Sequence, residues 1–475
     1  MSLLPARAAA QPDAGSPDPF LDSLSTLMRP WKGDFDAMKE RRLLRALVVY
    51  SRTYYFVDQG TQHGVSYEAL KAFEAEINRQ LGKRKLPFNI VFVPVTRDEI
   101  IPALLAGMGD LAAAGLTITP ERQKLVDFSV PVASGVREVA VTGPGTPPLA
   151  RIEDLAGRAV HVRRSSSYWE HLEDLNRRFA AQGRPPMKLV AVHEDLEDED
   201  VLEMVNAGLV PLTVVDRFKV LVWKDVLHKL AFEPEVAVST DNDLAWMLRK
   251  GSPKLKAVVD AFVRTHRQGT EFGNVLINRY EKSSRYLKEA TSPAELRKYR
   301  QTVDLFRKYS GRYDVDYLLM LAQGYQESRL DQEAKSSVGA VGIMQLMPVT
   351  GEQMAVGDIH QLEANIHAGV KYMRYVQDTY FAGEPMDPLV KHLFAFASYN
   401  AGPGRIHELR KDAARRGLDP NRWFRNVEVV AADKIGQETV TYVSNIFKYY
   451  VAYRLLADEE VERARSLQEE GLQPR

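Results

Sequence analysis

Cysteine is absent from the 475 residues of the chain. Disulfides, thiolate metal sites and thiol nucleophiles are therefore excluded. Long apolar runs are lacking as well: no stretch reaches the roughly 18 apolar residues that a membrane-spanning helix needs, and we expect no such helix. A lipid anchor would require a cysteine, and the sequence leaves peripheral membrane association open.

An excess of charge of either sign is also missing. Lys plus Arg and Asp plus Glu number 63 each, so the formal net charge is zero. Proteins that bind nucleic-acid backbones depend on a strongly positive field. We therefore expect no nucleic-acid partner.

Three common catalytic motifs do not occur, namely HExxH, the Walker-type glycine loop and GxSxG. Without them the sequence gives no support to a metalloprotease, a P-loop nucleotide hydrolase or a serine esterase. We interpret the acidic run HEDLEDEDVLEMV as a solvated helix start and not as a metal site. We expect neither a metal ion nor a cofactor.

The chain is too long for one ordinary core, so we expect two to four domains. Hydrophobic residues make up 45% of it, which is typical of a globular protein. The N-terminal stretch is rich in Pro, Ala, Gly and Asp and lacks the apolar core of a signal peptide. We expect residues 1–40 to form a disordered leader.

Residues 41–268 alternate between short β-branched runs and helical stretches. This alternation predicts α/β layers with largely parallel sheets. Gly and Pro punctuation places the crossovers between two lobes near residues 143–157 and 230–240. The expected strands are RALVVYS, FNIVFVPV, REVAVTG, RAVHVRR, KLVAVHE and VPLTVVD.

Helical periodicity dominates the remainder of the chain. We expect a helical connector at residues 269–293, a mostly helical domain at 294–458, and a polar helical tail at 459–475 that frays. The predicted fold class is therefore multidomain, with an N-terminal bilobed α/β module followed by a C-terminal, mostly α domain.

One glutamate stands where an apolar helix gives way to a glycine-rich turn. Glu327 lies at the end of YDVDYLLMLAQGYQES, and SSVGAVGIMQ follows shortly after it. Met and aromatic neighbours would strip water from the carboxylate, raise its pKa and let it hold a proton near neutral pH. Glu327 is therefore a candidate general acid. A glutamate at a helix end is more often just a solvated charge, so the local spacing does not establish catalysis.

Three separated motifs in this half resemble those of the soluble lytic transglycosylase domain, which has a goose-lysozyme-like fold. They are QESRLDQEAKSSVGAVGIMQLMP, ASYNAGPGRI and ETVTYV, in that order. The resemblance implies cleavage of the MurNAc–GlcNAc β-1,4 bond in peptidoglycan glycan strands, with Glu327 as acid and base. It also implies that the sugar cleft is lined or supported by Ser337, Gln345, Tyr399, Asn400, Glu438 and Tyr442. The first motif departs from many members, which have Asn-Pro in place of Asp331-Gln332.

Glycosidases normally use two carboxylates, but no second acid lies in a motif that resembles a partner for Glu327. In lytic transglycosylases the N-acetyl group of the muramic acid assists departure of the leaving sugar. The 6-hydroxyl of the same sugar then attacks, and a 1,6-anhydro end results. We favour this reaction because the motifs are of the transglycosylase type. The alternatives are a muramidase, in which water attacks, and a non-catalytic cell-wall-binding receptor.

The front half resembles the family-3 periplasmic solute-binding proteins, whose two lobes close over a small polar ligand. The stretch that carries this resemblance is GDLAAAGLTITPERQKLVDFSVP. The ligand-binding residues it implies are Tyr54 or Tyr55 as an aromatic wall, Thr117, Thr119 and Arg122 for a carboxylate, and Asp216 for an ammonium group. Arginine suits a carboxylate because its planar fork makes two parallel charge-assisted bonds.

A solute-binding module placed ahead of this catalytic domain resembles the membrane-bound lytic murein transglycosylases of the F type. The order of the modules suggests that a small ligand, a muropeptide or an amino acid, regulates the cleaving domain. Such control requires the ligand to favour one of two arrangements of the modules. We expect a periplasmic location at the inner face of the outer membrane.

Overall fold

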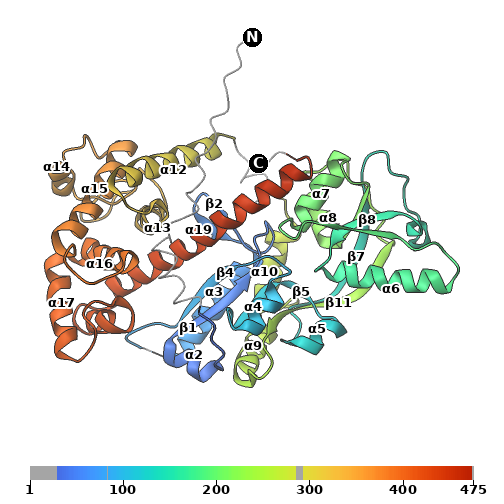
Figure 1. Cartoon of the computed structure of the whole chain (residues 1–475), viewed down its shortest axis with the longest axis horizontal. Helices are drawn as coiled ribbons and strands as arrows, with labels where there is room; N and C mark the ends of the chain where they lie inside the picture. Colours follow the sequence, from blue (N-terminus) through green and yellow to red (C-terminus); the bar gives the residue numbers. More distant parts are fainter. Residues whose placement is uncertain (1–28, 83, 285–292, 473–475) are drawn as a thin grey trace, which may run out of the picture.

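The computed structural model describes residues 29–82, 84–284 and 293–472 (Figure 1). Residues 1–28, which make up most of the expected leader, lie outside these ranges. Helix α2 (Phe35–Arg41) nevertheless begins inside the expected leader, and its Phe35 and Met38 are buried. Asp34 caps the helix by accepting a hydrogen bond from the N–H of Phe35. The folded part of the chain therefore starts before residue 41.

A seven-stranded mixed sheet organises the front module. Its strands are β1 (Leu43–Val48), β4 (Asn89–Pro94), β5 (Leu111–Thr117), β6 (Asp127–Phe128), β7 (Ala133–Thr142), β10 (Leu212–Asp216) and β11 (Ala237–Leu248). The order is β10-β7-β11-β5-β1-β4, with β6 paired to β11. β1 is parallel to both of its neighbours, whereas β11 is antiparallel to β5, β6 and β7. The expected parallel pairing therefore holds around β1 and not for the strands that join the lobes.

Two small sheets complete the strands. The β2 (Phe56–Asp58) and β3 (Thr61–His63) strands form a hairpin, and β8 (Ala159–Arg163) pairs in parallel with β9 (Lys188–Val192). We call the part built on β1, β4, β5 and β6 the first lobe. The part built on β8, β9 and β10 is the second lobe.

Two long strands carry the chain between these lobes. β7 leaves the first lobe and β11 returns to it, so the first crossing comes earlier than the expected 143–157. That stretch already packs in the second lobe, because Leu149 and Leu155 belong to its buried apolar cluster. The second crossing overlaps the expected 230–240.

Helices cover both lobes. Those of the first lobe are α3 (Val65–Leu81), α4 (Ile100–Ala106), α5 (Pro120–Leu125), α9 (Pro253–His266) and α10 (Glu271–Tyr280). Those of the second are η1 (Ile152–Leu155), α6 (Ser167–Ala181), α7 (Asp198–Ala207) and α8 (Arg217–Trp223). Helix α10 lies in the expected connector, but its Leu276 and Tyr280 pack with Phe56 of the first lobe.

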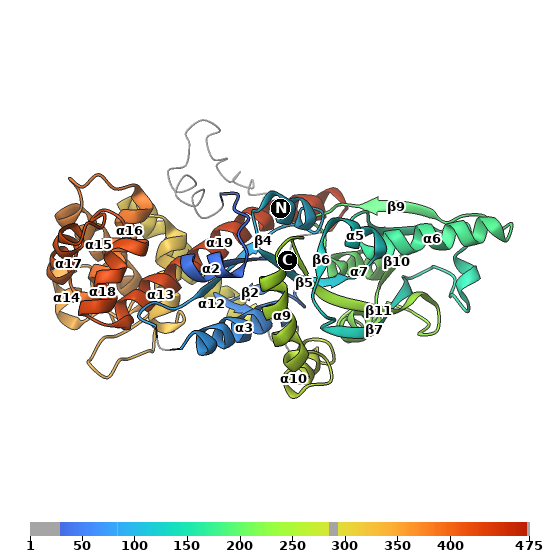
Figure 2. The ribbon, with the colours of Figure 1, turned by 90° about the horizontal axis from the view of Figure 1, so that it is seen from below.

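The second half is helical, as expected. Its elements are α12 (Pro293–Tyr313), α13 (Tyr317–Ser328), α14 (Pro348–Met354), α15 (Leu362–Tyr380), α16 (Pro388–Ala401), α17 (Pro403–Arg415), η2 (Trp423–Val427), α18 (Glu428–Lys434) and α19 (Gln437–Glu469). Figures 1 and 2 both place the first lobe between this helical domain and the second lobe. One buried apolar cluster contains Val91 and Val93 of the first lobe together with Val443 and Val451 of α19. The helical domain and the first lobe therefore share a continuous core.

Helix α19 runs diagonally from the helical domain, past the first lobe, to the near edge of the second lobe (Figure 1). Its 33 residues span about 50 Å at the usual rise of an α-helix. It packs against β4, the edge strand of the main sheet, and so covers a strand edge that would otherwise be open to pairing.

The C-terminal end of α19 docks on the second lobe. Arg463 Nε donates to Asp200 Oδ2 at 3.1 Å, and Leu467 is buried in an apolar cluster with Leu196 and Met204. The expected fraying tail at 459–475 is therefore wrong for the described residues up to 472. The sequence of this stretch is mostly polar, and its docking surface is built by residues more than 250 positions away.

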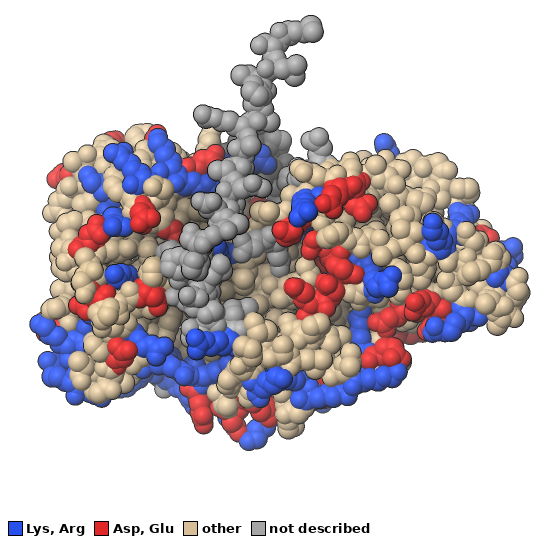
Figure 3. Space-filling model, in the orientation of Figure 1, with Lys and Arg blue, Asp and Glu red and all other residues tan. Residues whose placement is uncertain are grey.

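Both signs of charge are interspersed over the face shown in Figure 3, with Lys and Arg prominent along its lower left edge. Within the described ranges, no helix combines the length and the apolar character needed to cross a membrane.

Candidate functional sites

Helix α13 presents Glu327 at its last turn. Asp316 caps the start of the helix by accepting the N–H of Leu318 at 2.7 Å. The residues from Leu318 to Tyr325 are buried, and Arg329 ends the helix in the left-handed region at φ 56°. Glu327 therefore stands on a rigid, buried helix and not in a loop.

A tyrosine from the third motif touches the Glu327 carboxyl. Tyr442 Oη donates to Glu327 Oε1 at 2.5 Å, and Gln323 Nε2 donates to the same Tyr442 oxygen at 3.1 Å. Burial raises the pKa of Glu327 to about 7, and the Tyr442 hydrogen bond opposes the shift. No charged side chain contributes to that shift. The carboxyl can therefore hold a proton at neutral pH and can also release it.

The glycine-rich turn after α13 is held by buried amides. Asn365 is fully buried, accepts the N–H of Met344 at 2.9 Å, and donates to the carbonyl oxygen of Val341 at 3.0 Å. Gly342 has φ 78°, and a Cβ there would lie 2.2 Å from Asn365 Nδ2, so only glycine fits. Gln332 accepts the N–H of Ile343 at 3.2 Å. Gln332, which stands where many members of the family have proline, thus supports the turn.

Two predicted cleft residues serve this turn. Gln345 Nε2 donates to the carbonyl oxygens of Ala334 (3.1 Å) and Gly342 (2.9 Å). Tyr399 Oη donates to the Met344 carbonyl oxygen at 2.7 Å, and Glu327 is among the causes that raise the pKa of Tyr399. The structure therefore brings Tyr399 close to Glu327.

An open groove of about 380 Å³ lies beside the glutamate. Its lining residues are Gln326, Asn400, Gln437, Glu438, Thr441 and Tyr442. Thr439 Oγ1 donates to Asn400 Oδ1 at 2.6 Å, which orients the amide of the second motif from the helix of the third. Three predicted residues, Asn400, Glu438 and Tyr442, are thus brought together. Ser337 is not among them: it is exposed on the turn, and no contact joins it to Glu327 within the described part of the chain.

Sequence reasoning missed Gln323, Asn365 and Thr439. Gln323 precedes Glu327 by four residues and shares its helical face, so that spacing could have indicated it. Nothing in the local sequence distinguishes Asn365, because its partners in the turn, Met344 and Val341, lie 21 and 24 residues earlier. In the described ranges, no group of three or more His, Asp or Glu residues is arranged to hold a metal ion.

The cleft between the two lobes is nearly filled, with a volume of only about 40 Å³. Arg122 lines it, but its guanidinium already binds protein groups: Glu170 Oε1 at 3.1 Å and the carbonyl oxygens of Thr117 (3.1 Å) and Ser165 (2.9 Å). Glu170 and Ser165 belong to the second lobe. A carboxylate of the protein therefore lies against the arginine that was predicted to hold a ligand carboxylate.

Asp216, which was predicted to bind a ligand ammonium group, is likewise paired with a side chain of the protein. Lys219 Nζ lies 3.2 Å from Asp216 Oδ2 and pairs with Asp198 as well. Asp216 Oδ1 is buried without a hydrogen-bond partner among the described residues. Tyr54 is buried close by, with the Lys219 ammonium 5.3 Å from its ring centre.

Two further residues of the predicted ligand site serve the first lobe itself. Thr119 Oγ1 accepts the N–H of Arg122 at 3.3 Å and so caps α5. Tyr55 stacks on Phe92 in the core of the first lobe at 5.5 Å between ring centres. Neither residue lines the cleft.

The acidic run at the start of α7 is buried, which contradicts its interpretation as a solvated helix start. Glu197, Asp198, Glu199 and Asp200 are only 6%, 3%, 2% and 2% exposed. They lie at the N-terminal end of a helix, where the helix dipole favours negative charge. Burial and acidic neighbours raise the pKa of Glu199 to about 7.

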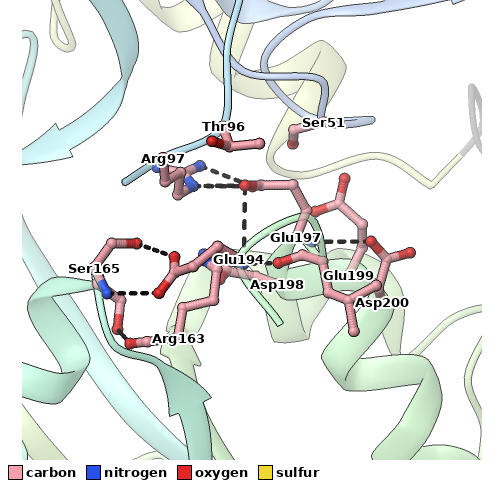
Figure 4. Close-up of polar contacts among 12 residues, drawn as sticks. Ser51, Thr96, Arg97, Arg163, Ser165, Glu194, Glu197, Asp198, Glu199 and Asp200 are labelled. Atoms are coloured by element: carbon pink, nitrogen blue, oxygen red, sulfur yellow. Dashed lines mark hydrogen bonds and ion pairs between the residues drawn. The ribbon is translucent and has the colours of Figure 1, made fainter. Parts of the chain in front are cut away.

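Each of these acids binds a different part of the molecule, and Figure 4 shows the four acids together with Arg97 and Arg163. Glu197 accepts two bonds from Arg97 of the first lobe, at 2.8 and 2.9 Å. Asp198 pairs with Arg163 and Lys219 of the second lobe, and Asp200 with α19. Glu199 Oε1 accepts the backbone N–H of Arg52 at 2.6 Å. The start of α7 therefore joins both lobes and the last helix of the helical domain.

Two family models match the chain, one in each half. Bacterial extracellular solute-binding proteins, family 3, matches residues 48–280, and the transglycosylase SLT domain matches residues 304–420. The chain is thus an SLT-type transglycosylase that carries a family-3 solute-binding domain in front.

Relatives that align with nearly the whole chain are called membrane-bound lytic murein transglycosylase F. The protein of that name from Desulfosudis oleivorans is 29% identical over 91% of this chain and 93% of its own length. Those from Ectopseudomonas mendocina and Stutzerimonas stutzeri are 27% and 28% identical, over 87% and 88% of this chain and 85% and 86% of their own lengths. The chain is similar to these proteins over nearly its whole length.

Proposed function

We propose that the protein is a peptidoglycan lytic transglycosylase that cleaves the MurNAc–GlcNAc β-1,4 bond, with Glu327 as its acid and base. The observation that carries the proposal is the buried, protonatable carboxyl of Glu327, which Tyr442 holds next to a groove in a chain that matches the SLT domain. Asn400 and Glu438 line that groove and would contact the sugars. Gln345 and Tyr399 would act by holding the turn that borders Glu327.

The reaction starts with proton transfer from Glu327 to the glycosidic oxygen as the bond to the anomeric carbon breaks. The N-acetyl group of the muramic acid supplies electrons to that carbon. The 6-hydroxyl of the same sugar then attacks it and returns its proton to Glu327. A nucleophile within the substrate has a high effective molarity and removes the need for a second carboxylate. No charged group contributes to the raised pKa of Glu327, which agrees with a reaction that uses one carboxylate.

The mass of the products tests the reaction type. We expect digestion of purified sacculi to release muropeptides with 1,6-anhydro ends, each lighter by one water than a hydrolysis product. The same digest in H₂¹⁸O should carry no label at the new end. A labelled, heavier end would show a muramidase, and no release at all would favour a receptor that only binds the cell wall.

The solute-binding domain would supply regulation by a small carboxylated ligand, a muropeptide or an amino acid. The cleft volume of about 40 Å³ is too small for either, so the lobes must open. A ligand carboxylate would then replace Glu170 on Arg122. Because α7 joins both lobes to α19, which carries Tyr442, lobe opening can reach the catalytic groove through one rigid helix.

Two substitutions with opposite effects test this ligand site. Glu170→Gln frees Arg122 and should tighten binding of a disaccharide tetrapeptide roughly 3–10-fold, because less energy is lost in opening. Arg122→Ala should weaken it at least about tenfold through loss of a charge-assisted pair. Titration calorimetry measures both, and Lys124→Ala on the same helix is the control. Absence of binding heat for muropeptides and free amino acids alike would reject the site.

We take residues 29–284 as the solute-binding module and 293–472 as the catalytic domain. Peptidoglycan lies in the periplasm, so we place the enzyme there, at the inner face of the outer membrane. The relatives are named membrane-bound, which supports a peripheral membrane association. Cell fractionation tests this location.

A further inference from the structure

The connection between α3 and β4 lies at the rim of the catalytic groove. Figure 1 shows this connection reaching sideways from the first lobe towards the helical domain. Gln437, which lines the groove, donates its Nε2 to the carbonyl oxygens of Arg84 (2.6 Å) and Lys85 (3.3 Å). Only the side chain of Gln437 therefore lies between this loop of the solute-binding module and the space where the glycan strand would bind.

The loop is held in place from both sides. The side chain of Asn78 accepts the N–H of Phe88 at 2.8 Å and donates to its carbonyl oxygen at 2.9 Å. Phe88 is 1% exposed. Lys85 pairs with Asp433 of α18, which also accepts from Arg416 at 2.7 Å. Because the backbone is fixed before any substrate arrives, little ordering entropy is lost on binding.

The loop supplies positive charge that the groove lacks. The lining of the groove contains one carboxylate, Glu438, and no cation. Arg84 is exposed, and no described residue offers its side chain an acidic partner. The side chain of Lys85 is 73% exposed despite its contact with Asp433. The rim next to Gln437 therefore carries two exposed cations.

We propose that Arg84 and Lys85 bind the carboxylates of the peptide stems on the glycan strand that is being cleaved. The inference rests on the proposed function, because it takes peptidoglycan as the substrate. The sugars of the strand are uncharged, whereas the stems carry free carboxylates. Arginine pairs with a carboxylate through its fork and lysine as a point charge. The front module would thus contribute to substrate selection directly, apart from any ligand in its own cleft.

The double variant Arg84→Ser/Lys85→Ser tests this subsite with two substrates that differ only in charge. One is native sacculi, and the other is sacculi whose carboxyls have been amidated. On native sacculi we expect KM to rise roughly 5–10-fold, with kcat unchanged, since two solvent-exposed pairs are lost. On amidated sacculi the variant and the wild type should have the same KM, already raised in the wild type.

Arg177→Ser/Lys188→Ser is the matched control, because it removes two exposed cations from the second lobe and should leave both KM values unchanged. An equal rise of KM on both substrates would mean that the loop only shapes the groove, and would overturn the proposal. An unchanged KM on native sacculi would overturn it too. If the wild type releases no anhydro products from either substrate, the proposed function itself fails.

Discussion

Glu327→Gln is expected to lower the turnover of sacculi by roughly 10³–10⁴-fold. One positioned acid or base contributes about 10²–10⁴-fold, and in the proposed reaction this carboxyl serves as the acid in one step and the base in the next. Glutamine keeps the shape and can still accept the Tyr442 hydrogen bond, so the groove and the binding of glycan should persist. Anhydromuropeptide release measures turnover, and co-sedimentation with sacculi measures binding.

The same variant should be more stable than the wild type at high pH. The folded pKa of Glu327, about 7, lies above its ordinary value of 4.5, so the folded state binds more protons between these values. Wild-type stability therefore falls as pH rises from about 4.5 to about 7, by at most about 3 kcal/mol. Urea unfolding should show no difference from Glu327→Gln at pH 4 and a more stable variant at pH 8. The activity of the wild type should fall above pH 7 as the acid loses its proton.

Tyr442→Phe is the informative companion to Glu327→Gln. It removes the hydrogen bond that opposes the raised pKa, so the fall in activity should move to higher pH.

Near-wild-type turnover in Glu327→Gln would contradict the assignment of the acid. A loss of both binding and folding in that variant would instead mean that the carboxyl is structural.

Asp198→Ala should destabilise the second lobe by about 3–5 kcal/mol. Asp198 is 3% exposed and pairs with Arg163 and Lys219, and it accepts the hydroxyl of Tyr168 at 2.9 Å. Removing one partner of a buried ion pair leaves the remaining charges buried and uncompensated, which costs this amount. Hydrogen exchange in peptides of β8 and β10 measures the free energy of opening.

Asp174→Ala is the control for that substitution. Asp174 also pairs with an arginine, but its side chain is 56% exposed, so the loss should stay below about 1 kcal/mol. Asp198→Asn keeps the shape and part of the hydrogen bonding and should lie between the two. Equal protection of β8 and β10 in Asp198→Ala and the wild type would show that the buried charges are compensated elsewhere.

Local sequence was sufficient for much of the fold and for singling out Glu327 as the proposed acid. The strand and helix alternation of the front half predicted β1, β4, β8, β9 and β10 close to their observed positions. Such segments are set by periodicity and by turn residues within a short window. The three motifs identified Asn400, Glu438 and Tyr442, which line one groove, and Glu327, which contacts Tyr442 beside it.

The errors share a physical cause, which is that polar sequence does not report burial. The local sequence at the start of α7 is acidic and predicts a solvated helix start. In the structure Arg97, Arg163 and Arg463, from three distant segments, pair with these acids and bury them. The end of α19 is just as polar and was expected to fray. Its partners lie on the second lobe, more than 250 residues earlier in the chain.

The sequence by itself determined the fold class, the order of the modules and the position of the proposed catalytic acid, because these depend on patterns within single segments. Only the tertiary structure decided that the ligand cleft is closed by Glu170 and Glu197, that one helix links Tyr442 to the second lobe, and that the α3–β4 loop borders the groove. Those features depend on contacts between residues far apart in the chain, and no local sequence pattern shows which charged side chains will pair.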